Sequence, residues 1–263
     1  MSLTMGRAPF ARPPGGEFNF PLDAPDHVLY FEDSPRRVRA VFGGVTVADS
    51  RRAKLLHETG QTPVYYFPEA DVRRDLLRPS NRADRTPHRG VESRWSVTTE
   101  DRTADAAAWS YTDPPDSAAF LAGYYAFEWD RMDAWYEEDE QVFVHPRDPY
   151  HRVDVRKSSR HVRVAIDGEL VAETRQPVLL FETGLPTRYY FPRQDVRSDL
   201  LEDSDRHTGC PYKGQASYYS VRTPRRLVRD VVWYYPEPLG EALGIRDRLA
   251  FFNERVELDV DSL

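Results

Sequence analysis

The feature that most constrains this chain is a stretch that occurs twice. Four short motifs follow one another at fixed spacing, and each recurs 124 residues later without a gap. They are Glu-Thr-Gly at 58–60 and 182–184, Tyr-Tyr-Phe-Pro at 65–68 and 189–192, Asp-Val-Arg at 71–73 and 195–197, and Asp-Leu-Leu at 75–77 and 199–201. An ungapped repeat of this length predicts two copies of one fold in a chain of 263 residues.

The repeat sets the predicted domains. We expect a first repeat at 18–140 and a second repeat at 141–263, each long enough to bury a core of its own. Residues 1–17 are rich in Pro, Gly and Arg, which predicts a disordered leader. The repeats are expected to pack about a pseudo-two-fold axis, as an internal pseudo-dimer within a monomer.

Composition argues against several classes of function. The net charge of −7 and the pI near 5.6 argue against nucleic-acid binding, because such surfaces are normally basic. No apolar run is long enough for a signal peptide or a membrane span, so we expect a soluble cytoplasmic protein. Cys210 is the only cysteine, so the chain can form no internal disulfide and no cysteine-rich zinc site.

Alternating apolar and polar residues predict a chain made mostly of strands. Val38, Ala40 and Phe42 occupy alternate positions before the Gly43-Gly44 pair, which predicts a two-residue hairpin turn. The second copy has Asp167-Gly168 at the same place. Further strands are expected at 64–67, 93–97, 106–111 and 124–127, and at 188–191, 217–221, 231–235 and 249–252. Many short strands joined by turns indicate an antiparallel sandwich or an open barrel.

Helix is expected to be scarce. Pro68 and Pro192 suit the first turn of a short helix, and a second short helix is expected after the prolines near 115 and 238. On the first of these helices, Asp71 and Asp75 would share one face, as would the equivalent pair at 195 and 199. Paired carboxylates could serve acid–base or metal chemistry, but the arginine between them favours a solvated, Arg-paired face.

These motifs, in combination, resemble the domain of unknown function 427 family, also labelled nucleotidyltransferase-like. Three further segments carry the resemblance: Cys210-Pro211-Tyr212-Lys213-Gly214, Tyr218-Tyr219-Ser220-Val221 and Trp233-Tyr234-Tyr235. The resemblance covers both repeats. It implies two tandem, mainly β domains of the Mss4-like or β-tent type, with antiparallel sheets and few short helices, and it implies no established activity.

The residues do not support the nucleotidyltransferase label. The chain has no Gly-Ser motif followed by paired aspartates and no Gly-rich loop that would cradle a phosphate. Relatives with the β-tent fold often hold zinc through paired cysteines, which this chain lacks. We therefore expect no metal and no cofactor.

The two copies differ at one segment that the resemblance makes important. The second repeat has Cys210 and Lys213 in Cys-Pro-Tyr-Lys-Gly, where the first has Thr86-Pro87-His88-Arg89-Gly90. The family pattern has Cys and Lys at these positions, so the second repeat is expected to be the more competent one. A lysine near a cysteine could lower the pKa of the thiol and make it nucleophilic, or could bind an anion. The alternative is an inert packed cysteine in a turn that leads into a strand.

Glu58 and Glu182 lie in otherwise apolar stretches. Either carboxylate could bind a ligand or act as a general base with a raised pKa. The alternative is a structural carboxylate that caps backbone amides or pairs with an arginine. The seven histidines show no metalloprotease spacing, and His57 and His88 are exchanged for Phe181 and Tyr212 in the other copy, which indicates packing roles.

Aromatic residues recur in both copies. On a strand, neighbours face opposite sides, so one tyrosine of each Tyr-Tyr pair is predicted to face the core and the other could line a pocket. Trp109 shares a face with Tyr111, and Trp233 shares one with Tyr235. A stripe of aromatic residues is also typical of an ordinary core.

Three functions remain open. The first is a small-molecule binding or sensing protein with a pocket between the sheets of each repeat. The pocket is expected to be better preserved in the second repeat, and its ligand is not identified. The residues expected to bind it are Glu182, Tyr190, Asp195, Lys213, Trp233 and Tyr235, and in the first repeat Glu58, Tyr66, Asp71, Trp109 and Tyr111. The second is an enzyme that uses Cys210 with Lys213 and Glu182. The third is a scaffold without chemistry.

Overall fold

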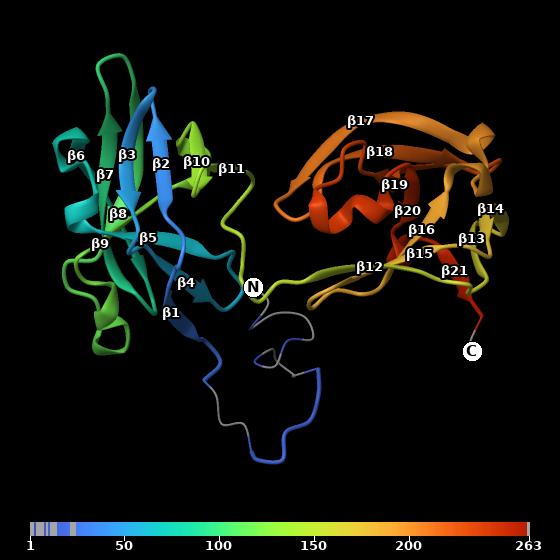
Figure 1. The fold of residues 1–263 in the computed structure, drawn as a ribbon, viewed down its shortest axis with the longest axis horizontal. Coiled ribbons are helices and arrows are strands. Elements are labelled where there is room, and N and C mark those ends of the chain that lie inside the picture. The colour runs from blue at the N-terminus through green and yellow to red at the C-terminus, as the bar shows by residue number, and fades with distance from the viewer. Residues whose placement is uncertain (1–2, 4–7, 9, 11–14, 22–24, 262–263) are drawn as a thin grey trace. The chain divides into compact units, whose positions relative to one another are not determined.

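The structure, a computed structural model, describes residues 3, 8, 10, 15–21 and 25–261 (Figure 1). The chain divides into two compact units, Met1–Asp148 and Pro149–Leu263. The leader predicted at 1–17 lies mostly outside the described residues. Among the described residues, no helix is both long enough and apolar enough to cross a membrane.

The first unit consists of strands joined by turns and short 3-10 helices. Its strands are β1 (Leu29–Asp33), β2 (Val38–Phe42), β3 (Val45–Ser50), β4 (Lys54–Glu58), β5 (Val64–Pro68), β6 (Leu77–Thr86), β7 (Gly90–Thr98), β8 (Thr103–Ser110), β9 (Tyr124–Phe127), β10 (Ala134–Glu137) and β11 (Glu140–Val142). Its 3-10 helices are η1 (Glu69–Asp71), η2 (Arg74–Leu76), η3 (Asp116–Leu121) and η4 (Trp129–Arg131). The strands form a seven-stranded sheet, β1-β4-β5-β9-β8-β7-β6, and a four-stranded sheet, β11-β10-β2-β3.

The second unit repeats this order. Its strands are β12 (Val153–Lys157), β13 (Val162–Ile166), β14 (Glu169–Thr174), β15 (Val178–Glu182), β16 (Arg188–Pro192), β17 (Leu201–Cys210), β18 (Gly214–Arg222), β19 (Leu227–Tyr234), β20 (Arg248–Phe251) and β21 (Glu257–Val260). Its 3-10 helices are η5 (Arg193–Asp195), η6 (Ser198–Leu200), η7 (Gly240–Ile245) and η8 (Asn253–Arg255). The seven-stranded sheet is β12-β15-β16-β20-β19-β18-β17, and the smaller sheet is β14-β13-β21. Paired strands run antiparallel in both units.

Each seven-stranded sheet is apolar on both faces. In the first unit, Phe67 and Trp135 lie in a core shared by the two sheets, whereas Tyr66 and Trp109 lie in a separate cluster on the other face. We call this second face the outer face. The second unit has the same arrangement, with Phe191 in the core between the sheets and Tyr190 in the outer cluster. The prediction of two mainly β, similar halves is therefore confirmed.

The hairpins form where the sequence predicts them. Gly43 and Gly44 join β2 to β3 with φ of +57° and +73°, and Asp167 and Gly168 join β13 to β14 with φ of +55° and +79°. Positive φ at both central residues defines the type I′ turn, whose twist matches that of the flanking strands. Asp and Gly adopt this conformation more readily than most residues.

The predicted helix with two aspartates on one face is wrong. η1 ends at Asp71, and Val72 is extended (φ −114°, ψ 135°) before η2 begins. The extended residue separates two single 3-10 turns, so Asp71 and Asp75 do not share a helix face. Asp75 instead pairs with Arg73 at 2.7 Å. The helices expected after the prolines near 115 and 238 are present as η3 and η7.

Candidate functional site

Apart from Asp195, the acidic and aromatic residues singled out in the second repeat gather on the outer face of its seven-stranded sheet. Tyr190, Trp233 and Tyr235 lie in the outer cluster, while Tyr189 and Phe191 pack toward the core between the sheets. We expected a pocket between the sheets. Alternation along β16 turns Tyr190 away from that core, so these residues meet on the opposite face, part of which η7 covers.

A buried ion pair lies at one end of this cluster. Lys213 Nζ contacts Glu182 Oε2, and His151 Nε2 lies 3.0 Å from Glu182 Oε1. The His151 ring stacks on Tyr212, with centroids 4.2 Å apart. Lys213 is 8% exposed, and the Glu182 side chain is 7% exposed. Glu182 therefore uses both carboxylate oxygens within the protein.

The surroundings of Glu182 keep its carboxylate ionised. Burial by itself would raise the pKa of Glu182, but the hydrogen bond from His151 and the charge of Lys213 outweigh burial, and the pKa is lowered. This is the opposite of the raised pKa expected of a general base. The carboxylate therefore serves as an anionic partner for Lys213 and His151.

Two large aromatic side chains are linked by a hydrogen bond beside this ion pair. The Trp233 indole Nε1–H donates to the Tyr190 hydroxyl at 3.0 Å. Burial raises the pKa of Tyr190, and the nearby Glu182 and Cys210 raise it further. Burial also raises the pKa of Tyr235, followed by the effects of Tyr190, Cys210 and Glu182. Both phenols are therefore neutral hydrogen-bonding groups at physiological pH.

Cys210 lies at the edge of the same cluster. It is partly exposed, ends β17 and packs against the outer cluster. The chain then turns into β18 at Gly214, whose φ is +97°. A Cβ at Gly214 would lie 2.9 Å from the carbonyl oxygen of Glu237, so this close approach needs glycine. The turn into a strand that the sequence predicts here is confirmed, and it fixes Lys213 between the two strands.

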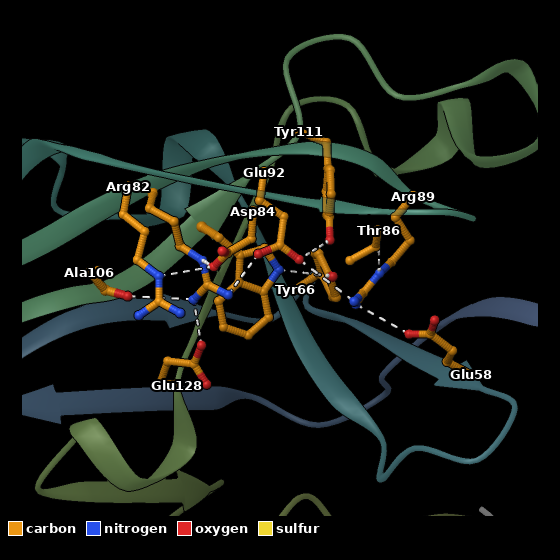
Figure 2. A network of polar contacts seen from close by, with 12 residues as sticks. Glu58, Tyr66, Arg82, Asp84, Thr86, Arg89, Glu92, Ala106, Tyr111 and Glu128 are labelled. Carbon is orange, nitrogen blue, oxygen red and sulfur yellow. Dashed lines mark hydrogen bonds and ion pairs between the residues drawn. The ribbon is translucent and has the colours of Figure 1, made fainter.

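The first repeat has an equivalent site with more charges. His27 Nε2 lies 3.0 Å from Glu58 Oε1. Arg89 Nη1 lies 3.2 Å from Glu58 Oε2 (Figure 2). The His27 ring stacks on His88, with centroids 3.6 Å apart. The Trp109 indole donates to the Tyr66 hydroxyl at 3.2 Å. The same glutamate, histidine, tryptophan and tyrosine positions are thus used in both copies.

A second buried carboxylate extends the network of the first repeat. The Tyr111 hydroxyl donates to Glu92 Oε1 at 2.8 Å (Figure 2). Arg94 Nη2 lies 2.7 Å from Glu92 Oε2. Arg89 Nη2 lies 3.6 Å from Glu92 Oε1. Arg94 also contacts Glu128. Glu92 is 3% exposed, so these contacts compensate for the desolvation of its side chain.

Several of these charged residues are replaced in the second repeat. The sequence offset places Ala216 opposite Glu92, Tyr218 opposite Arg94 and Phe252 opposite Glu128. The Trp233 and Phe252 rings lie 4.6 Å apart between centroids, and the Tyr218 and Phe252 rings are stacked at 6.5 Å. At these positions the second repeat therefore has aromatic or small side chains, where the first repeat has charged ones.

Asp71 and Asp195 lie apart from both clusters. Asp195 Oδ2 accepts a hydrogen bond from Thr174 Oγ1 at 2.6 Å, and Asp71 Oδ2 accepts one from Ser50 Oγ at 2.6 Å. Asp71 also pairs with Arg52. Thr174 and Ser50 end β14 and β3, which belong to the smaller sheets. These aspartates therefore tie the η5 and η1 turns to the smaller sheets.

Sequence reasoning missed His27 and His151. Neither was considered for the site, although each lies against the glutamate of its repeat. They are 124 residues apart, the offset that relates the two copies. A search of the seven histidines for this offset would have found the pair.

The residues do not form a zinc site of the paired-cysteine kind. Paired cysteines are lacking, and the described residues contain no group of three His, Cys, Asp or Glu side chains placed to hold a metal ion. Two surface depressions lie elsewhere. One of about 450 Å³ is lined by Arg37, Asp49, Arg51, Arg52 and Asp71. The other, of about 360 Å³, lies over β13, β14 and β21.

A comparison with curated protein sequences found no match. A family model described as a domain of unknown function, DUF427, matches residues 30–138 and 154–262. The two matched regions correspond to the two units of the structure and contain both candidate sites except for His27 and His151. The chain therefore belongs to the DUF427 family and carries two tandem copies of its domain.

Proposed function

We propose that the second repeat binds a small molecule at the cluster formed by Glu182, Lys213, His151, Tyr190 and Trp233. The contrast between the two copies carries this proposal. In the first repeat, additional charged side chains extend the network. In the second, aromatic rings replace two of these side chains and lie in the outer cluster.

This combination suits a ligand site. Small-molecule sites are mostly apolar and aromatic, with a few placed polar groups that fix orientation. Trp233 and Phe252 supply the aromatic surface, and Lys213 with Glu182 supplies the charge. A buried ion pair is a poor source of stability by itself, because the desolvation of two charges can exceed their attraction. We infer that the pair is retained for recognition.

The proposal takes the chain as a cytoplasmic monomer. The single cysteine is consistent with a reducing compartment. The internal repeat supplies the second copy that a homodimer of single domains would otherwise supply.

Ligand-dependent stabilisation tests the proposal. The full chain should be screened by thermal unfolding against a library of anionic, neutral and aromatic metabolites, because a ligand that binds only the folded state raises the melting temperature. Trp233→Phe should weaken the response to any ligand found, and the matched variant Trp109→Phe in the first repeat should leave it unchanged. A library without a stabilising ligand, or a response lost only in Trp109→Phe, would count against this site.

Cys210 favours a second candidate function, an enzyme with a cysteine nucleophile, because the thiol is partly exposed at the edge of the cluster. The contact between Lys213 and Glu182 disfavours it, because the ammonium that would stabilise a thiolate already has a carboxylate partner. Cys210→Ser separates the two functions. A binding site should keep its ligand response in this variant, whereas a cysteine enzyme would lose turnover of that ligand.

A further inference from the structure

We propose that the ligand of the second repeat is a carboxylate, bound where the Glu92 side chain lies in the first repeat. This inference rests on the proposed function and names its ligand class. In the first repeat this carboxylate belongs to a side chain of the protein. In the second repeat it would come from a bound ligand.

The first repeat shows how the fold receives a carboxylate at this place. Glu92 Oε1 accepts a hydrogen bond from the Tyr111 hydroxyl at 2.8 Å, and Arg89 lies 3.6 Å from the same oxygen. Arg94 lies 2.7 Å from Oε2. Figure 2 shows Tyr111 and Arg89 directed toward Glu92. A hydrogen bond such as the one from Tyr111 to an ionised acceptor is among the stronger ones in proteins.

The second repeat keeps donors but lacks this carboxylate. Tyr235 and Lys213 stand opposite Tyr111 and Arg89, while Ala216 stands opposite Glu92. Tyr235 is 6% exposed, and its hydroxyl bonds to none of the residues that the structure describes. The oxygen is not one of the fully buried polar atoms, so the hydroxyl is free to donate to an acceptor that enters here.

The difference between the two side chains gives the size of the smallest probe. Ala216 retains the Cβ of Glu92 but lacks the methylene and the carboxylate beyond it. These missing atoms correspond to acetate. A larger carboxylic acid could extend from this point over the aromatic rings of Tyr218 and Phe252.

Charge is also available for an added anion. Arg94 has no counterpart at Tyr218, but the Arg206 guanidinium lies 4.8 Å from the Tyr218 ring centroid. Together with Lys213, Arg206 could offset the charge of a bound carboxylate.

The place beside Ala216 is closed to solvent. Ala216 is 1% exposed, so a ligand can reach it only if neighbouring side chains move aside. Cys210 packs in the same cluster and is partly exposed. Because it is the only cysteine, its rate of labelling by a thiol reagent reports on this place alone.

The first experiment is labelling of Cys210 in the full chain during titration with acetate, with acetamide as the neutral isostere and sodium chloride at matched ionic strength. Acetate should slow labelling, by about tenfold at about ten times its Kd, because the bound state shields the thiol. Tyr235→Phe should weaken acetate binding about tenfold or more, since it removes a donor to a charged acceptor. Tyr111→Phe, in the first repeat, should leave acetate binding unchanged.

The second experiment exchanges the side chains at the equivalent positions. Ala216→Glu should abolish the effect of acetate, because the new side chain fills the place. Glu92→Ala should lower the melting temperature of the chain, and acetate, but not acetamide, should restore part of the loss. This readout does not depend on the second repeat or on its native ligand.

The outcomes separate this inference from the proposed function. Equal effects of acetate and acetamide, or an acetate effect that survives Tyr235→Phe, would overturn the carboxylate assignment. Acetate could have no effect on labelling while a neutral metabolite stabilises the chain and binds Trp233→Phe more weakly. That result would support the binding function and contradict only the carboxylate assignment. If no compound of any class binds, both fall.

Discussion

His151 and Glu182 are held together by a 3.0 Å contact between Nε2 and Oε1, although 31 residues separate them in sequence. Backbone contacts next to them reinforce this link: Arg152 N–H donates to Thr183 Oγ1 at 2.9 Å, and Thr183 N–H donates to the Arg152 carbonyl at 3.0 Å. The contact therefore joins the segment before β12 to the end of β15. It also places an imidazole on the carboxylate that holds Lys213.

The first prediction concerns acid stability. The pKa of Glu182 is lower in the folded state than in the unfolded state. Its ionisation therefore stabilises the fold at pH values above the unfolded-state pKa, and this stabilisation is lost as the pH falls through the folded-state pKa. Glu182→Gln should therefore destabilise the chain at about pH 7 and show a weaker further loss on acidification. Urea unfolding at several pH values measures this, with exposed Glu140 changed to Gln as the control. An acid loss as steep as in the native chain would contradict the assignment.

The second prediction concerns the ion pair itself. Lys213→Met leaves the buried Glu182 carboxylate without its cation, and the loss of one partner of a buried pair typically costs about 3–5 kcal/mol. Adding Glu182→Gln should recover part of this loss, because the remaining charge is also removed. Denaturant unfolding of both single variants and the double variant gives the coupling energy. Additive losses would show that the two side chains do not stabilise each other.

The third prediction compares two carboxylates of the first repeat. Glu92 is buried between two arginines and a tyrosine, so Glu92→Ala should cost about 3–5 kcal/mol. The Glu128 side chain is 43% exposed and contacts the same Arg94, so Glu128→Ala should cost about 0–1 kcal/mol. Equal losses in chemical denaturation would mean that burial does not determine the contribution of these charges.

The fourth prediction concerns the turn that positions Lys213. Gly214→Ala places a Cβ 2.9 Å from the Glu237 carbonyl oxygen at a φ of +97°, so it should destabilise the chain by about 1–3 kcal/mol. Gly168→Ala also has positive φ, but no atom lies within 4 Å of the added Cβ, so its cost should be closer to about 1 kcal/mol. Thermal unfolding of the two variants gives the comparison. A smaller loss for Gly214→Ala would show that the turn can shift.

The fold was predictable from sequence where its determinants are local. The alternation around Ala40 and the glycine pair after Phe42 specify strands and a turn within a few residues. The helix predicted to carry Asp71 and Asp75 failed because Val72 pairs with Ala48 of β3, a tertiary contact that no spacing rule reveals.

The site was predictable only in part. Glu182 and Lys213 were selected, and the structure brings them together, but their contact spans 31 residues and depends on the folding of several strands. The face of the sheet was not predictable, because both faces are apolar and the outer one is covered by η7, whose position depends on packing. The sequence also could not show that Asp195 lies apart from the cluster, because the position of Asp195 depends on packing as well.

The last prediction tests the hydrogen bond between the two aromatic side chains. Tyr190→Phe keeps the ring but leaves the Trp233 indole N–H without its acceptor in a buried cluster, which should cost about 1–3 kcal/mol. The neighbouring variant Tyr189→Phe is the matched control, because this side chain packs against the core between the sheets and its hydroxyl bonds to no described residue. Tyr66→Phe should reproduce the loss in the first repeat, where Trp109 donates to Tyr66. Denaturant unfolding measures all three variants. Since the same bond occurs in both copies, equal losses at Tyr190 and Tyr66 would identify it as part of the shared fold, whereas a loss of ligand binding confined to Tyr190→Phe would assign it to the site.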